Sequence, residues 1–227
     1  MPVDLCHELI ATARAAAAAG LVVGTVGNLS ARDGDRILIS ASGARLDSLT
    51  ADHFTRLSLA DGRILAGRMR PSSEHELHLS IYRQHPEAGA ILHTHAPWST
   101  AIACVLDELP CIHYQMLSLG GAVRVAPYRC FGTRELARVT LQALEGRSAV
   151  LMSNHGATVF AATPVAALES MQVLEFACTV YWRAAQLGTP RVLDTVQWQE
   201  VAAHVERLGY GVMHARDGTP DGSATTP

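Results

Sequence analysis

The sequence predicts a layered α/β or α+β domain, and three observations support this class. Segments with apolar residues at helical spacing alternate with short β-prone runs. A hairpin signal occurs early in the chain, which argues against a purely parallel sheet. The 227 residues, 48% of them apolar, are enough for one full core. We therefore expect a single domain over residues 1–215 and a disordered tail at 216–227, which has no apolar side chain able to anchor it.

The N-terminal part of the chain should hold one helix and a β-rich segment. Apolar residues follow Asp4, a plausible N-cap, at helical spacing, and the helix is expected to stop at Gly20. Further along, Asp61-Gly62 is a turn signal between two β-prone runs at 54–59 and 63–65. These runs are predicted to form a hairpin.

The remaining chain alternates helices with strands. Ser73 and Glu76 have the spacing of a capping box and predict a helix that ends near Gln84. The other expected elements are strands at 36–39, 90–92, 149–152 and 158–161, and helices at 133–144, 163–187 and up to about 208.

Charge and cysteine usage exclude several classes of partner. The net charge of −3 comes from 18 basic and 21 acidic residues without long like-charge runs, so no nucleic acid or membrane partner is expected. The five cysteines have no CxxC spacing, and no signal peptide or membrane span is predicted. A cytoplasmic protein that acts on a small molecule fits this pattern.

All 18 basic residues are arginines, because the sequence contains no lysine. Schiff-base chemistry needs an amine that can lose its proton, which arginine does not provide. Lysine-dependent aldol chemistry, pyridoxal phosphate attachment and a P-loop lysine are therefore excluded. If a carbonyl is activated here, a metal ion or hydrogen bonds must activate it.

Among eleven histidines, only His93 and His95 form a His-x-His pair, at the end of an apolar strand. The two-residue period of a strand puts both imidazoles on one face, where they can share a metal ion. His155, in a glycine-containing turn after the strand at 149–152, is the best candidate for a third ligand. Taken alone, such histidines are more often ordinary residues at strand ends.

Glu74 is predicted to lie in the first turn of the helix begun by Ser72-Ser73, where the helix dipole stabilises a carboxylate. The amides and hydroxyls of this helix start suit an anionic group of a substrate. Two further turns, Gly27-Asn28 and Ser42-Gly43, offer similar groups. Each of these residues alone would more often only form a loop or begin a helix.

The chain resembles the class II aldolase/adducin family, most closely its L-fuculose-phosphate aldolase branch, over roughly residues 5–212. The segments that carry this resemblance are Gly24-Thr25-Val26-Gly27-Asn28-Leu29-Ser30, Ile39-Ser40-Ala41-Ser42-Gly43, Arg70-Pro71-Ser72-Ser73-Glu74, His93-Thr94-His95, Ile112-His113-Tyr114, Ala126-Pro127-Tyr128, Phe131-Gly132-Thr133-Arg134-Glu135-Leu136 and Asn154-His155-Gly156. Together they form a specific pattern.

The resemblance implies a single three-layer α/β/α domain with a central mixed, largely antiparallel sheet. It also implies Zn²⁺, with Mn²⁺ or Co²⁺ as alternatives, on His93, His95 and His155. The implied phosphate ligands are Gly27, Asn28, Ser42, Gly43, Ser72 and Ser73.

In the activity that this resemblance implies, a ketose 1-phosphate such as L-fuculose 1-phosphate is cleaved reversibly to dihydroxyacetone phosphate and a small aldehyde. Glu74 would move protons on the enediolate, and Tyr114 would handle the proton of the aldehyde oxygen. Tyr210 would close a neighbouring site in a homotetramer with active sites between subunits.

Several other functions remain open because similar sites serve different reactions. They include sugar-acid phosphate decarboxylase, dehydratase or epimerase activity and aldol cleavage of non-phosphorylated hydroxy-ketoacids. Glu74 and His113 favour aldol cleavage over epimerisation, since the epimerase branch typically has other residues there. A non-catalytic, adducin-like interaction module is disfavoured by the three histidines.

Overall fold

The structure is a computed structural model that describes residues 3–208. The chain divides into two compact units, one ending at Leu193 and the other beginning at Asp194. Tyr210, the predicted domain end at 215 and the predicted tail at 216–227 lie outside the described residues.

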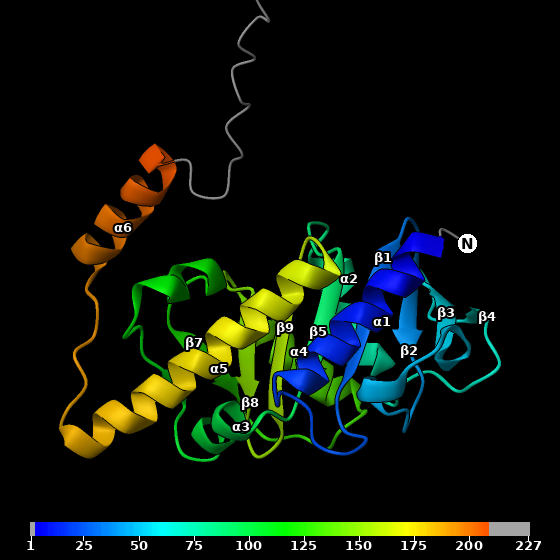
Figure 1. Ribbon diagram of the computed structural model, residues 1–227, viewed down its shortest axis with the longest axis horizontal. Coiled ribbons are helices and arrows are strands. Elements are labelled where there is room, and N and C mark those ends of the chain that lie inside the picture. Colours follow the sequence, from blue (N-terminus) through cyan, green and yellow to red (C-terminus); the bar gives the residue numbers. More distant parts are fainter. Residues whose placement is uncertain (1–2, 209–227) are drawn as a thin grey trace, which may run out of the picture. The chain divides into compact units, whose positions relative to one another are not determined.

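The first unit is built on a nine-stranded sheet with the order β4-β3-β2-β1-β5-β9-β8-β7-β6 (Figure 1). The strands are β1 Asn28–Asp33, β2 Arg36–Ser40, β3 Phe54–Ser58, β4 Ile64–Ala66, β5 Ala90–Thr94, β6 Glu108–Leu109, β7 Val123–Ala126, β8 Ala149–Met152 and β9 Gly156–Ala161. Neighbouring strands are antiparallel except for β7 and β8, which are parallel. The predicted mixed, largely antiparallel sheet is confirmed.

Helices cover both faces of this sheet. They are α1 Val3–Ala18, α2 His75–Gln84, α3 Pro97–Ala103, α4 Arg134–Leu144 and α5 Pro164–Leu187. The long helix α5 packs on β5 and β9 and contacts α1 and α3, and Figure 1 shows α1 beside it. Helices α2 and α4 pack against each other on the other face. The three-layer α/β/α arrangement is therefore confirmed.

The main core lies between the sheet and the layer of α2 and α4. Ile91 of β5 and Phe160 of β9 belong to it, together with Leu77 and Ile81 of α2. Since side chains two residues apart in a strand share a face, His93 points to the same side as Ile91. Strand β5 thus directs the His93 side chain toward the face of the sheet that α2 and α4 cover.

Most sequence-predicted elements are present, but both proposed helix caps are wrong. Helix α1 begins at Val3, before Asp4. Helix α2 begins at His75 with Glu74 as its N-cap residue, and no side chain caps it, so the capping box of Ser73 and Glu76 does not form. Glu74 therefore precedes the first turn of the helix, which leaves its carboxylate for other contacts.

The second unit contains helix α6, Thr195–Leu208, which agrees with the predicted last helix. Within residues 3–208, no helix is long and apolar enough to cross a membrane. All five cysteines lie in this part of the chain and form no disulfide.

Candidate metal centre and substrate pocket

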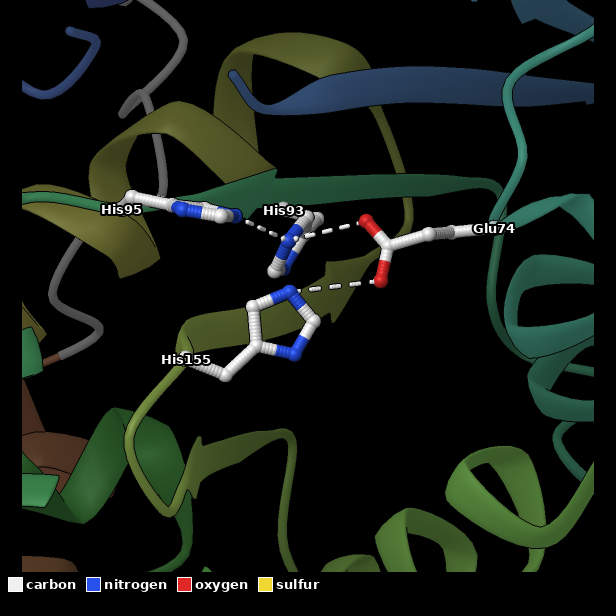
Figure 2. A group of neighbouring side chains, drawn as sticks. All are labelled: Glu74, His93, His95 and His155. Atoms are coloured by element: carbon white, nitrogen blue, oxygen red, sulfur yellow. Dashed lines mark hydrogen bonds and ion pairs between the residues drawn. The ribbon is translucent and has the colours of Figure 1, made fainter. Parts of the chain in front are cut away.

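The three predicted histidine ligands and Glu74 come together at one point (Figure 2). Each of the four residues offers one nitrogen or oxygen ligand atom, and these four atoms all lie within 4.8 Å of one another. The Nε2 atoms of His93 and His95 are 3.0 Å apart, and Glu74 Oε2 lies 3.1 Å from His93 Nε2. His155 Nε2 is 3.4 Å from Glu74 Oε1. Residues far apart in the sequence thus form one cluster.

The backbone fixes each of the three histidines at or next to a strand end. His93 lies in β5 between its neighbours β1 and β9, and His95 follows directly after β5. His155 lies in the tight turn between β8 and β9, where Asn154 has a left-handed φ of 54°. A β-carbon on Gly156 would be 2.3 Å from the carbonyl oxygen of Thr94. Glycine therefore allows the turn to approach β5 closely enough for the histidines to meet.

The hydrogen bonds of His93 show which of its nitrogens faces the cluster with a lone pair. His93 Nδ1 lies 2.9 Å from the carbonyl oxygen of Ala157, which can only accept, so Nδ1 donates. In the neutral ring Nε2 is then an acceptor, and it faces the acceptor Glu74 Oε2. Two acceptors at 3.1 Å need a cation beside them. A metal-bound histidine typically has this second hydrogen bond to a carbonyl.

The donor set and the spacing both fit a divalent metal. Three imidazole nitrogens leave a further position open, as in zinc sites of the catalytic type. Ligand atoms about 2.1 Å from one ion in a tetrahedral site lie about 3.4 Å from each other. The separation of 3.0 Å between the Nε2 atoms of His93 and His95 is close to that value, and all four residues offer a ligand atom within 4.8 Å of the others.

The protonation of the cluster also favours a cation. Burial lowers the pKa of His95 to about 3 and that of His155 to about 4, with the charge of His93 adding to the effect. Both rings are therefore neutral at pH 7, as metal ligands must be. Burial by itself would raise the pKa of Glu74, but the charge of His93 and the hydrogen bonds from His93 and Asn28 outweigh it and lower that pKa. The carboxylate is ionised.

His93 responds in the opposite direction. Burial lowers its pKa, but the negative charge of Glu74 and the hydrogen bond to it prevail, so the pKa of His93 is raised. A proton and a metal ion thus compete for the same position between His93 and Glu74.

A pocket opens above this cluster, and it contains all six residues predicted to bind phosphate. Its lining is Thr25, Val26, Gly27, Asn28, Ala41, Ser42, Gly43, Ser72, Ser73, Glu74, His95, Tyr128, Arg129, Phe131, Asn154 and His155. His93 is fully buried beneath it. The side chain of Asn28 is also turned inward, because its amide donates to Glu74 Oε2 at 3.0 Å.

Two predicted residues are not part of this arrangement. Tyr114 is 55% exposed, stacks on His113 and does not line the pocket of its own chain. Tyr210 lies outside the described residues. Their proposed catalytic roles stay predictions.

Arg129 was not predicted from the sequence, although it brings a guanidinium group to the pocket wall. It forms an ion pair with Glu135 at 3.5 Å, and its Nη1 donates to the carbonyl oxygen of Tyr128. No spacing signal marks it, because it lies in an irregular loop. The only available clue was its place beside the Tyr128 and Phe131 segments.

Comparisons with known proteins agree with this site. The profile described as Class II Aldolase and Adducin N-terminal domain matches residues 7–182. The chain is 36% identical to a 5-methylthioribulose-1-phosphate/5-deoxyribulose-1-phosphate aldolase of Rhodospirillum rubrum, over 91% of this chain and 93% of that protein. It is 31% identical to an L-fuculose phosphate aldolase of Escherichia coli, over 90% and 94%.

A solved structure titled L-fuculose 1-phosphate aldolase superposes with a TM-score of 0.87 and 32% identity, covering 91% of this chain and 98% of that one. The chain belongs to the class II aldolase and adducin family and is a metal-dependent aldehyde-lyase.

Proposed function

We propose that this protein is a zinc-dependent aldolase that cleaves a ketose 1-phosphate reversibly to dihydroxyacetone phosphate and a short aldehyde. One observation carries the proposal: an ionised, buried carboxylate lies against three imidazoles at the base of a pocket with hydroxyl groups and glycines on its wall. The same donor set also suits Mn²⁺ and Co²⁺. His93, His95 and His155 would hold the ion.

A divalent ion in this position supplies Lewis acidity to the ketose carbonyl and its neighbouring hydroxyl oxygen. In the cleavage direction, the C4 hydroxyl gives its proton to Tyr114 of a neighbouring subunit, which accepts it as the phenolate, the C3–C4 bond breaks and C4 becomes the aldehyde carbon. The electron pair of that bond remains on the C2–C3 fragment as an enediolate. Glu74, which is ionised in the resting site and takes up a proton at Oε1 for this step, gives that proton to C3, which yields dihydroxyacetone phosphate. Proton exchange with water then returns Glu74 and Tyr114 to their starting states, so no proton is gained or lost overall.

The pocket wall offers a site for the phosphate. The hydroxyls of Ser42, Ser72 and Ser73 and the open backbone at Gly27 and Gly43 lie on one pocket. The start of α2 adds the positive end of a helix dipole. We assign phosphate binding to these residues together with the second amide N–H of Asn28.

The aldehyde side of the reaction is assigned to tyrosines from a neighbouring subunit. Tyr114 is exposed and outside its own pocket, which fits a role in the pocket of another copy. Tyr114 would accept the proton of the C4 hydroxyl in cleavage and donate it to the aldehyde oxygen in the reverse reaction. Tyr210 would close the active site of the neighbouring subunit. This assignment requires an oligomer, for which we propose a homotetramer.

The names of the relatives suggest the aldehydes to test. Cleavage between C3 and C4 of 5-deoxyribulose 1-phosphate gives acetaldehyde, 5-methylthioribulose 1-phosphate gives methylthioacetaldehyde, and L-fuculose 1-phosphate gives lactaldehyde. The first two aldehydes lack the hydroxyl of lactaldehyde. Val26, Tyr128 and Phe131 give the pocket an apolar wall, so we place the two pentulose phosphates first.

The test is to incubate zinc-loaded protein with each of the three ketose phosphates and to follow dihydroxyacetone phosphate by a coupled assay. A chelated sample is the control for metal dependence. We expect release from at least one substrate, and only with metal. No release from any of them by protein that holds one ion per chain would contradict the proposal and favour decarboxylation, dehydration or a non-phosphorylated substrate.

A further inference from the structure

Glu74 is the end of a chain of buried hydrogen bonds that leads away from the pocket. Asn28 Nδ2 donates to Glu74 Oε2 at 3.0 Å, and Asn28 Oδ1 lies 2.6 Å from His78 Nε2. The hydroxyl of Ser30 is 2.7 Å from His78 Nδ1 and 2.9 Å from the hydroxyl of Tyr82. All five side chains are buried.

Elementary chemistry fixes the direction of every bond in this chain. The ionised carboxylate of Glu74 only accepts, so the nitrogen of the Asn28 amide faces it and the amide oxygen faces His78. His78 Nε2 must then carry the proton. In the neutral ring Nδ1 accepts from Ser30, whose oxygen accepts from Tyr82. The other tautomer of His78 would favour the reversed amide and place two acceptors 3.0 Å apart at Glu74.

The chain of hydrogen bonds forms because the two-residue spacing along strand β1 matches the four-residue spacing along helix α2. Asn28 and Ser30 are two residues apart on β1, so they share a face and are about 6.7 Å apart. Glu74, His78 and Tyr82 are spaced by four residues along α2 and its N-cap, so they share a face at steps of about 6 Å. The polar residues of β1 therefore alternate with those of α2 along the hydrogen-bond chain.

The arrangement leaves the two oxygens of Glu74 in different states. Oε2 is held by Asn28 and faces His93. Oε1 is buried without a hydrogen-bond partner and lies 3.4 Å from His155. The hydrogen-bond chain thus holds Oε2 in place and leaves Oε1 to carry the proton that Glu74 transfers.

We propose that His78 is a positioning residue of the aldolase reaction, which fixes the Asn28 amide and thereby aims Glu74 Oε1 at the reacting carbon. His78 itself touches neither substrate nor metal. The inference rests on the proposed function, since it assigns a purpose to the proton transfer by Glu74. Ser30 and Tyr82 set the tautomer of His78. Their effect on kcat should be smaller than that of His78, and smallest for Tyr82, which is furthest from Glu74.

The test uses a half-reaction that needs no aldehyde. Glu74 takes a proton from the hydroxymethyl carbon of dihydroxyacetone phosphate, the electron pair enters the enediolate, and in D₂O a deuteron returns to the carbon. Proton NMR follows this exchange. The variants are His78→Phe, which removes both ring nitrogens, His78→Gln, which keeps a donor for Asn28, and Tyr82→Phe, which changes only the far end.

We expect His78→Phe to lower kcat for exchange per bound metal about 100-fold, while KM for dihydroxyacetone phosphate changes less than about threefold. His78→Gln should recover to within about tenfold of the wild type, and Tyr82→Phe should stay within about threefold. A metal-loaded His78→Phe protein that exchanges within about threefold of the wild type would overturn the proposal, because the chain would then only support the fold.

Two further measurements keep the proposal testable if His78→Phe does not fold. Ser30→Ala removes the donor to His78 Nδ1, and we expect an approximately tenfold lower kcat; an unchanged kcat overturns the proposal. In ¹⁵N-histidine-labelled protein, long-range ¹H–¹⁵N spectra should assign His78 as the Nε2–H tautomer, and an Nδ1–H tautomer overturns it. If wild-type protein catalyses no exchange, the proposed function fails, whereas the tautomer still tests the hydrogen-bond chain.

Discussion

The floor and the rim of the pocket differ in how firmly the fold holds their side chains in place. The floor of the pocket, which we define as Glu74, His93 and Asn28, is at most 5% exposed, and each side chain is held by hydrogen bonds or ring contacts. The rim, which we define as Tyr128, Arg129 and Phe131, lies in an irregular loop, and its two aromatic rings are 59% and 64% exposed. The floor is built for a fixed chemical step, and the rim can change with the aldehyde.

The largest expected effect comes from removing a metal ligand that lies against the floor, because His155 Nε2 is 3.4 Å from Glu74 Oε1. His155→Ala should lose the bound ion and lower turnover by about 1000-fold or more, because both carbonyl activation and the position of Glu74 depend on this cluster. His7→Ala, in the exposed part of α1, is the matched control. Metal analysis and dihydroxyacetone phosphate release measure both. Full metal content in His155→Ala would show that this ligand assignment is wrong.

The next largest effect is expected where the start of β9 approaches the end of β5 closely. In Gly156→Ala the new methyl group would meet the carbonyl oxygen of Thr94 at 2.3 Å and the His95 ring at 3.1 Å. We expect about a 100-fold loss of turnover together with weaker metal binding. Gly34→Ala has a positive φ but open space, so it should cost only about 1 kcal/mol of stability and leave activity intact. Equal activities of the two variants would refute the argument.

His78, which is buried behind the floor and hydrogen-bonded to Asn28, should also make stability depend on pH. Burial, together with the charge of His93, lowers the pKa of His78 from 6.5 to about 3. Between these values the unfolded chain binds the proton and the folded chain does not, so this contribution to stability is present above pH 6.5 and is lost as pH falls.

The free energy of unfolding of the wild type should therefore fall by about 1 kcal/mol more per pH unit than that of His78→Gln between pH 6 and pH 4. Urea titrations at several pH values measure this difference. Parallel acid profiles for the two proteins would contradict it.

The smallest effects are expected at the rim. Arg129→Met should raise KM for the ketose phosphate by about two- to tenfold and leave kcat and metal content nearly unchanged, since the guanidinium is half exposed and already paired with Glu135. Arg134→Met, at an exposed position of α4, is the control. A large loss of kcat in Arg129→Met would place this residue in the chemistry and remove the contrast between floor and rim.

The sequence was informative where residue type and spacing are both constrained. The His-x-His pair, the turn at His155 and the helix start at Glu74 each had a local signal, and they meet in the structure. Strand β1 was missed because its inward face is polar, as Asn28 and Ser30 are buried by hydrogen bonds to α2 and not by apolar contact. Arg129 was missed because loop residues have no periodicity to mark them.

The central claim is that Glu74 performs the proton transfer beside a bound divalent ion. The most direct test measures ion stoichiometry and dihydroxyacetone phosphate release in the wild type, in Glu74→Gln and in Glu76→Gln, whose carboxylate lies two residues further along the chain in the first turn of α2. We predict one ion per chain in all three proteins and a loss of about 1000-fold in kcat for Glu74→Gln alone. A Glu74→Gln protein that holds its ion and turns over within about tenfold of the wild type would contradict the account.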